Sequence, residues 1–365
     1  RAGGDGSRPP AHGERGREDE RQRRVGALAV RIDVSPAYEL VLSLFAFGCS
    51  DRDDYEVGST WFERTYESAS PELKAGLDFF AAAGELLVGL LGIVHDLPAP
   101  KTIESLLARM EEIDPIQLRV ELLRCCAPGV SAADLTAVAA GDRDLLDRLL
   151  AEHGAIKHKA AFDAVLADEP ALVQDTMVTA MRRFAEEGLG DTSQLVTVLE
   201  RDATEKRALA ATRTPERLVE LATNGVTFAP GPEVTGVVLI PSIVVRPWVV
   251  IAEHRGLRLF AYSVTDESMS ADPAAPSQWM VGFYKALGDE RRLRILGILS
   301  EGPANLSDIT EQIGLSKSTV HHHISILRQA GMVRVTVGAD KEYSLRTEAV
   351  PHANAMLAAY LGERT

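Results

Sequence analysis

Apolar residues recur at helical spacing through most of the chain, from Pro36 to about Asn224. Apolar side chains three or four positions apart form one face of a helix, so this pattern predicts a long, mainly helical region. Breaks at Pro71, Pro115 and Pro170 divide the region into several helices. Alternating apolar residues at 28–34 predict one short strand before the first helix.

The pattern changes to runs of β-branched residues between Val226 and Val264, which predicts a small sheet that closes the helical domain. Residues 265–277 are rich in Asp, Ser, Pro and Ala, the composition of an interdomain linker. Residues 1–24 mix both charges with Gly and Pro and contain no apolar run, so we expect a disordered tail rather than a signal peptide. A mainly helical regulatory domain is therefore expected over 25–264.

The pattern in segment 278–365 predicts, in order, two helices, a short third helix, a tight turn, a fourth helix, a hairpin and a last helix. In the second of these helices, residues 290–300, we expect Leu293, Leu296 and Leu299 to face the core. The overall prediction is a mainly α protein of the α+β type, with the helical domain followed by a C-terminal winged helix-turn-helix.

A tight turn leads into the fourth helix of this segment. Ser307 is placed to cap a short helix at 308–313, and residues 314–316 form a three-residue turn. Ser316 then caps a recognition helix over 316–330.

Three apolar residues of the recognition helix, Val320, Ile324 and Leu327, are spaced to face the core. The polar residues are left on the outer face near the helix N-terminus, where the helix dipole favours phosphate and side chains can reach base edges. Polar residues on an exposed helical face are also common without any function. The predicted DNA-binding residues of this helix are Ser316, Lys317, Ser318, Thr319, His321, His322 and Ser325.

A hairpin follows at 332–346, in which Val333, Val335 and Val337 alternate with polar residues. We expect Lys341 at or beside its tip and Arg334 on its outer side, where both could touch the DNA backbone or minor groove. A helix-turn-helix followed by such a wing is far more specific for DNA binding than either feature alone.

The C-terminal segment resembles the ArsR class of winged-helix repressors. The resemblance is carried by KALGDERRLRIL (285–296), LSKSTVHHHISILRQAGMV (315–333) and VTVGADKEYSL (335–345), and covers about a quarter of the chain. It implies a repressor that binds duplex DNA, with Lys317, Ser318, His321 and His322 at DNA-reading positions. It also implies a homodimer through the helices at 279–287 and 351–361, whose apolar stripes include Phe283, Leu287, Ala353, Met356 and Tyr360.

The N-terminal region resembles an uncharacterised domain that precedes winged helices in actinobacterial regulators. The features that carry this resemblance are VSPAYELVLSL (34–44) and VVLIPSIVVRPWVVI (237–251). No activity is implied, but a small-molecule or protein effector is expected in a cleft between the helices and the 226–264 sheet.

Net charge divides unevenly along the chain. The whole sequence carries −14, whereas ten Lys or Arg against nine Asp or Glu leave 278–365 at about +1. The excess of acidic residues therefore lies in the N-terminal part, and the net charge of the winged helix does not oppose binding to DNA phosphates. Because the module is only weakly basic, a protein-docking role for it is the alternative to DNA binding.

Metal and catalytic sites are not predicted. The metal-sensing members of the ArsR class use cysteines on the helix before the recognition helix or Asp and His pairs on the last helix; here the first reads SDITEQI and the second offers only His352. Three consecutive histidines, 321–323, point about 100° apart and cannot converge on one ion. Cys125 and Cys126 could chelate a thiophilic ion with a third ligand such as Cys49, although a small buried apolar role is commoner.

No phosphate loop or nucleophile elbow occurs in its required context, so we predict no enzyme and no cofactor. The three cysteines, an odd number in which Cys49 lies far from the adjacent Cys125 and Cys126, give no disulfide framework and favour the cytoplasm. The most apolar stretch, Phe79–Val94, is interrupted by Glu85 and is expected to be a buried helix rather than a membrane span.

Overall fold

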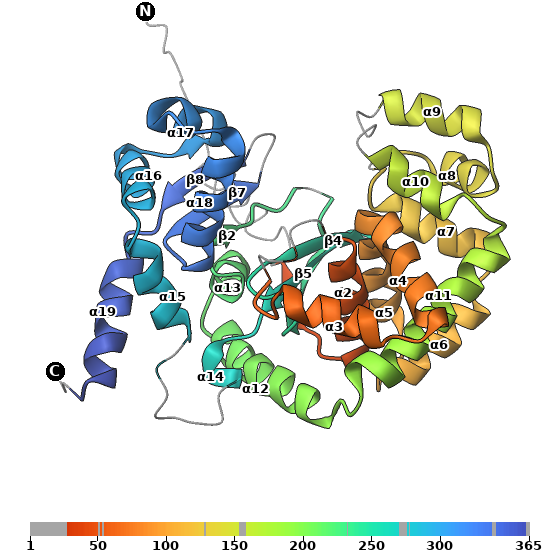
Figure 1. Cartoon of the computed structure of the whole chain (residues 1–365), viewed down its shortest axis with the longest axis horizontal. Coiled ribbons are helices and arrows are strands. Elements are labelled where there is room, and N and C mark those ends of the chain that lie inside the picture. The colour runs from red at the N-terminus through yellow and green to blue at the C-terminus, as the bar shows by residue number, and fades with distance from the viewer. Residues whose placement is uncertain are drawn as a thin grey trace, which may run out of the picture.

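The computed structural model describes residues 28–49, 52, 55–127, 129–152, 158–231, 233–269, 276, 278–337 and 341–362. The predicted tail at 1–24 lies outside this range. The described chain is mainly helical with two small sheets, which confirms the predicted fold class (Figure 1).

The N-terminal region is a bundle of helices, as the apolar spacing predicted (Figure 1). Several of these helices begin at a proline that follows a capping side chain, as at Pro36, Pro71 and Pro115. The helices are α2 (Pro36–Phe47), α3 (Ser59–Ser68), α4 (Pro71–Ala83), α5 (Leu90–Asp96), α6 (Ile103–Glu112), α7 (Pro115–Arg124), α8 (Ala132–Ala139), α9 (Arg143–Glu152), α10 (Lys159–Val165), α11 (Pro170–Phe184), α12 (Ser193–Ala210) and α13 (Pro215–Ala222), with a 3₁₀ turn η2 (Gly84–Gly89) and a π turn η4 (Ala185–Leu189).

One continuous helical segment, Pro71–Asp96, is longer than the predicted apolar stretch because η2 joins α4 to α5. By length and composition its 26 residues could cross a membrane, with a mean hydropathy of 1.9 in the most apolar window. Of that window, 56% is buried inside the protein, among the other helices of the bundle. The core helix of a globular domain has the same properties, so this segment is weak evidence for a membrane span.

The first sheet has the order β1 (Ala29–Ile32), β3 (Gly236–Ser242), β5 (Leu257–Ser263) and β4 (Val250–His254). Strands β1, β3 and β5 are parallel, and β4 is antiparallel to β5. The sheet is buried on both faces. Side chains alternate between the two, so Val238 and Ile240 pack on the helical bundle whereas Val237 and Leu239 pack on the opposite side.

The winged helix lies on that opposite side of the sheet (Figure 1). A single apolar cluster joins Leu239 and Tyr262 of the sheet to Val219 of α13 and to Ile295 and Leu327 of the winged helix. The sheet is therefore a shared wall between the bundle and the C-terminal module. The elements of the winged helix are α15 (Gln278–Leu287), α16 (Glu290–Glu301), β6 (Ala304–Asn305), α17 (Leu306–Ile313), α18 (Lys317–Gln329), β7 (Val333–Val337), β8 (Lys341–Leu345) and α19 (Ala349–Tyr360).

The second sheet differs from the expected arrangement. Its order is β2 (Val226–Thr227), β7, β8 and β6, and β2 runs parallel to β7 of the wing. Val226 therefore belongs to the wing sheet and not to the small sheet that the sequence predicted to start there. The pattern of β-branched residues identified a strand but could not say which sheet it joins. A short helix, α14 (Asp266–Met269), also forms in the stretch expected to be a linker.

Candidate nucleic-acid interface

The turn between α17 and α18 follows the predicted geometry. Gly314 adopts the left-handed conformation, with φ of 70°, and its N–H donates to the carbonyl of Thr310 at the end of α17. Ser316 caps α18, because its side chain accepts a hydrogen bond from the N–H of Thr319 at 3.2 Å. The cap of α17 is Asn305 rather than the predicted Ser307, so that helix begins at Leu306.

The N-terminal half of α18 presents polar side chains to solvent. Val320 is buried, as predicted, whereas Lys317, Ser318, His321 and His322 are exposed. Ser316 is also exposed, and Thr319 is partly buried with its hydroxyl 2.7 Å from that of Ser316. Five of the predicted DNA-binding residues therefore share one accessible surface at the start of the helix, and Thr319 lies at its edge.

The C-terminal half of α18 is covered by the rest of the protein. Ile324 and Leu327 are buried as predicted, but Ser325 is also buried, with an exposed fraction of 6%. The guanidinium of Arg328 lies 5.0 Å from the ring centroid of Trp248, in the loop before β4. The prediction that Ser325 lies on the outer face is wrong, because Ser325 is buried in the half of the helix whose Arg328 contacts Trp248 of the N-terminal part.

His323 is the second buried polar residue of α18. Among the described residues neither of its ring nitrogens has a hydrogen-bond partner. Burial lowers the pKa of His323 below its ordinary value of 6.5, while the nearby Asp289 opposes that change. Burial therefore favours the neutral form of His323, which lies near the charged residues Asp289 and Arg292 at the start of α16.

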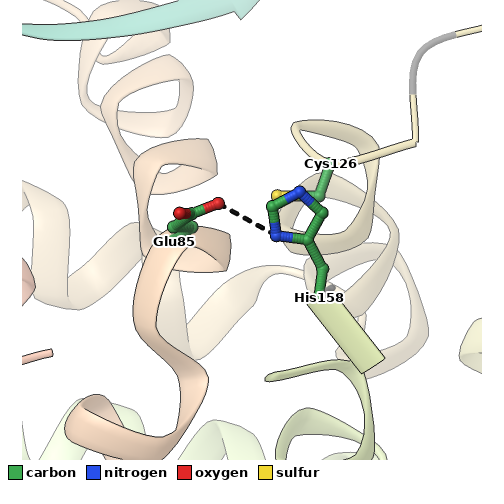
Figure 2. Close-up of side chains that lie close together, drawn as sticks. All are labelled: Glu85, Cys126 and His158. Carbon is green, nitrogen blue, oxygen red and sulfur yellow. Dashed lines mark ion pairs between the residues drawn. The ribbon is translucent and has the colours of Figure 1, made fainter. Parts of the chain in front are cut away.

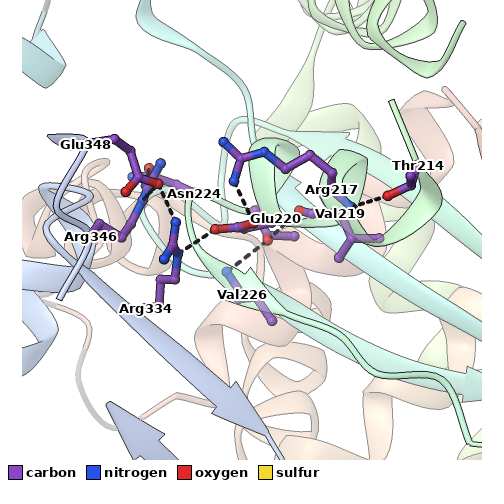
Figure 3. A network of polar contacts seen from close by, with 10 residues as sticks. Thr214, Arg217, Val219, Glu220, Asn224, Val226, Arg334, Arg346 and Glu348 are labelled. Carbon is purple, nitrogen blue, oxygen red and sulfur yellow. Dashed lines mark hydrogen bonds and ion pairs between the residues drawn. The ribbon is translucent and has the colours of Figure 1, made fainter. Parts of the chain in front are cut away.

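The base of the wing is held by ion pairs with the N-terminal region (Figure 3). Arg334 pairs with Glu220 of α13 and with Glu348, just before α19, and its side chain is 26% exposed. The carboxylate of Glu220 also pairs with Arg217 at 2.6 Å, and these cations hold the pKa of Glu220 below its usual value despite burial. Arg334 thus points toward α13 and not toward the outer side that the sequence predicted. Lys341, by contrast, is exposed at the start of β8.

Asn224 forms a second connection at the same place (Figure 3). Its side chain accepts a hydrogen bond from Arg346 at 2.7 Å and donates to the carbonyl of Gln329 at the end of α18. The residue has a φ of 50°, which is uncommon for a non-glycine residue. Asn224 therefore joins the end of α13 to both α18 and the segment after β8.

The apolar residues of α15 and α19 divide into two sets. Phe283 and Ala353 are buried within the chain, so they do not offer a surface to a partner as the sequence predicted. The exposed large apolar residues on these helices and beside them are Tyr284, Val350, Tyr360 and Leu361. Leu293 of α16, predicted to face inward, is 49% exposed because Ile295 takes the buried position instead.

One group of potential metal ligands occurs in the part of the chain that the structure describes. It consists of Glu85, Cys126 and His158, and it does not contain Cys49, the third ligand considered from the sequence. Sequence reasoning missed Glu85 and His158 because nothing in their local pattern places them beside Cys126.

Comparison with known proteins identifies the C-terminal module. The profile of the family described as bacterial regulatory protein, arsR family, matches residues 289–335. The transcriptional repressor SmtB homolog of Synechocystis sp. is 34% identical over 101 residues, which are 27% of this chain and 74% of that protein.

Two other relatives match shorter segments. The transcriptional repressor SdpR of Bacillus subtilis is 37% identical over 54 residues, 15% of this chain and 60% of its own. The HTH-type transcriptional regulator NmtR of Mycobacterium tuberculosis is 36% identical over 66 residues, 18% of this chain and 54% of its own. The chain thus covers less than two thirds of the length of these two relatives. The crystal structure of an ArsR family transcriptional regulator, 26% identical, covers 24% of this chain and 100% of its own, with a TM-score of 0.22.

Proposed function

The chain belongs to the ArsR family of bacterial regulatory proteins, and from this premise we propose that it represses transcription by binding a specific duplex DNA site. The family is one of transcription regulators and not of enzymes, as the sequence predicted. The observation that carries the proposal is the capped, exposed N-terminal half of α18, together with an exposed Lys341 on the wing. Polar groups at a helix N-terminus suit base edges and phosphates in the major groove.

We assign the DNA contacts to the exposed part of the predicted set. Lys317, Ser318, His321 and His322 would face the major groove, and Lys341 would meet the backbone beside it. Ser316 and Thr319 would act mainly through the cap that fixes the start of α18. Ser325 and Arg334 are engaged inside the protein and leave the proposed contact set.

A homodimer would place two copies of α18 in successive major grooves, about 34 Å apart. The exposed Tyr284, Val350, Tyr360 and Leu361 on and beside α15 and α19 supply an apolar surface for this contact. Replacing Tyr360 with Asp should move the protein toward the monomer in sedimentation experiments, because it would bury an unpaired charge in that surface. We place the protein in the cytoplasm, where the DNA lies.

The N-terminal region would supply the regulatory input. A cavity of about 760 Å³ lies between it and the winged helix, within the size range of small-molecule sites. Its walls include Asn224, Arg246 and Thr265 on one side and Trp279 and His352 on the other. This differs from the cleft expected between the bundle and its sheet. Because the N-terminal region and the winged helix both line the cavity, the affinity for a ligand there would depend on the position of one relative to the other.

The DNA proposal is tested by fluorescence anisotropy with labelled DNA from upstream of the protein's own gene, titrated at several salt concentrations. Selective binding that weakens steeply with salt is expected, since released counterions drive phosphate contacts. Lys317→Ala and His322→Ala should each cost about 1–3 kcal/mol on the specific site. Lys74→Ala on α4 removes the same charge from the bundle and serves as the matched control.

Unselective binding, or an affinity that does not change with salt, would contradict the proposal and favour a protein-docking role for the winged helix. If Lys317→Ala and Lys74→Ala weaken binding equally, then the assignment of the N-terminal half of α18 as the contact surface is wrong.

A further inference from the structure

We propose that Glu85, Cys126 and His158 form a binding site for one thiophilic divalent cation such as zinc. The three side chains come from segments far apart in the sequence: the 3₁₀ turn η2, the turn after α7 and the residue before α10 (Figure 2). This site lies in the helical bundle, apart from α18 and the wing, so it stands independently of the DNA-binding proposal.

The geometry brings one donor atom from each residue to a common point. The sulfur of Cys126, a ring nitrogen of His158 and a carboxylate oxygen of Glu85 all lie within 4.8 Å of one another. His158 Nδ1 is 2.9 Å from Glu85 Oε2 (Figure 2). In a tetrahedral zinc site with bonds of about 2.0–2.3 Å, donor atoms lie roughly 3.3–3.8 Å apart. Shifts of about an ångström or less would therefore bring the three donors into bonding geometry.

The donor set selects the class of ion. A thiolate, an imidazole nitrogen and a carboxylate oxygen are the ligand types of zinc and similar borderline ions, whereas magnesium and calcium prefer oxygen ligands only. A deprotonated Cys126 and Glu85 would together contribute two negative charges and His158 none, which balances a divalent cation. Binding would release the thiol proton of Cys126 to solvent and replace the contact between His158 and Glu85 by bonds to the ion.

Access and spacing fit such a site. The Glu85 side chain is 67% exposed, which gives an ion a path from solvent, while the His158 side chain is only 14% exposed. Cys125 places a second sulfur 3.5 Å from that of Cys126, but it is directed at the backbone carbonyl of Leu122 at 3.1 Å and is not one of the three grouped ligands. The three-residue set leaves a coordination position for water.

Bound metal would connect η2, the turn after α7 and the start of α10. A ligand that binds only the folded state raises stability according to its concentration and affinity. The expected consequence is therefore a rise in the melting temperature of the full chain with added zinc.

The test uses the full-length, reduced and metal-stripped protein with cobalt(II) as a spectroscopic probe and zinc(II) as its competitor. One equivalent of cobalt should produce a sulfur-to-cobalt charge-transfer band that zinc abolishes, and zinc should raise the melting temperature. Cys126→Ser should lose the band, and Glu85→Gln and His158→Ala should weaken cobalt binding at least tenfold. Glu85→Gln changes an exposed residue, so it separates loss of a ligand from loss of folding.

Cys49→Ser is the matched control, because Cys49 lies just after α2, in contact with Tyr55, and is not part of the group formed by Glu85, Cys126 and His158. It should keep the band and the zinc-induced stabilisation. Absence of a charge-transfer band in the parent protein overturns the proposal, and so does a band that persists unchanged in Cys126→Ser. Equal cobalt affinity of Glu85→Gln, His158→Ala and the parent protein also overturns it.

Discussion

The winged helix has an outer face that meets solvent and an inner face that meets the rest of the chain. The outer face carries the start of α18 and Lys341, with exposed polar side chains. The inner face carries the end of α18, Arg334 and Arg346, and it is joined to the N-terminal region by strand β2, ion pairs and a shared apolar cluster. Polar residues on the outer face are therefore candidates for DNA contact, whereas polar residues on the inner face hold the protein together.

The largest expected effect concerns the buried apolar side of α18, formed by Val320, Ile324 and Leu327. Ile324→Ala should lower the free energy of unfolding by about 2–5 kcal/mol, because it removes buried methyl groups and leaves a cavity. Urea denaturation measures the change. His321→Ala, three positions earlier and exposed, should stay within about 0.5 kcal/mol. If both variants lose a similar free energy of unfolding, then His321 is also packed against the protein and the outer face is not exposed as described.

The next effect tests the inner face. Arg334→Ala should lower stability by roughly 1–3 kcal/mol, because Glu220 and Glu348 lose their shared partner. DNA affinity at fixed salt should change little if Arg334 serves structure rather than phosphate contact. A double-mutant cycle with Glu220→Gln isolates the pair. If Arg334→Ala leaves stability intact and reduces DNA affinity together with its salt dependence, Arg334 belongs to the outer face.

A smaller effect depends on pH. Because burial lowers the pKa of His323 in the folded state, the unfolded chain takes up its proton first as the pH falls. Stability should therefore be highest above pH 6.5 and decrease below it, by at most about 1.4 kcal/mol per pH unit from this residue. His323→Gln should flatten this part of the stability profile, measured by urea denaturation at several pH values, whereas the exposed His321→Gln should not. The idea fails if His323→Gln leaves the slope unchanged.

The smallest effect compares two serines of the same helix. Ser318→Ala on the outer face should weaken specific DNA binding by roughly 1 kcal/mol, the cost of one hydrogen bond. Ser325→Ala on the inner face should change it less than twofold, since its hydroxyl is buried. Anisotropy titrations on one DNA site give both values. A larger loss for Ser325→Ala would reverse the assignment of the two faces.

The sequence predicted much of this module from local signals. The spacing of Val320, Ile324 and Leu327 set the buried side of α18, and Ser316 marked its start. Both signals act within one or two turns of helix, where neighbours in sequence are neighbours in space. The same reasoning failed for Leu293, because two apolar residues two positions apart, Leu293 and Ile295, compete for one buried side and only packing selects between them.

What only the tertiary structure decided is which polar surfaces are covered. Periodicity indicates that Ser325 and Arg334 are not on the core side of their elements, but it cannot show that Ser325 is buried or that Glu220 of α13 pairs with Arg334. The meeting of Glu85, Cys126 and His158 has the same origin. Local sequence fixes the conformation of a segment, whereas contacts between distant segments depend on how all the apolar faces are buried together, and that decides which side chains remain available for function.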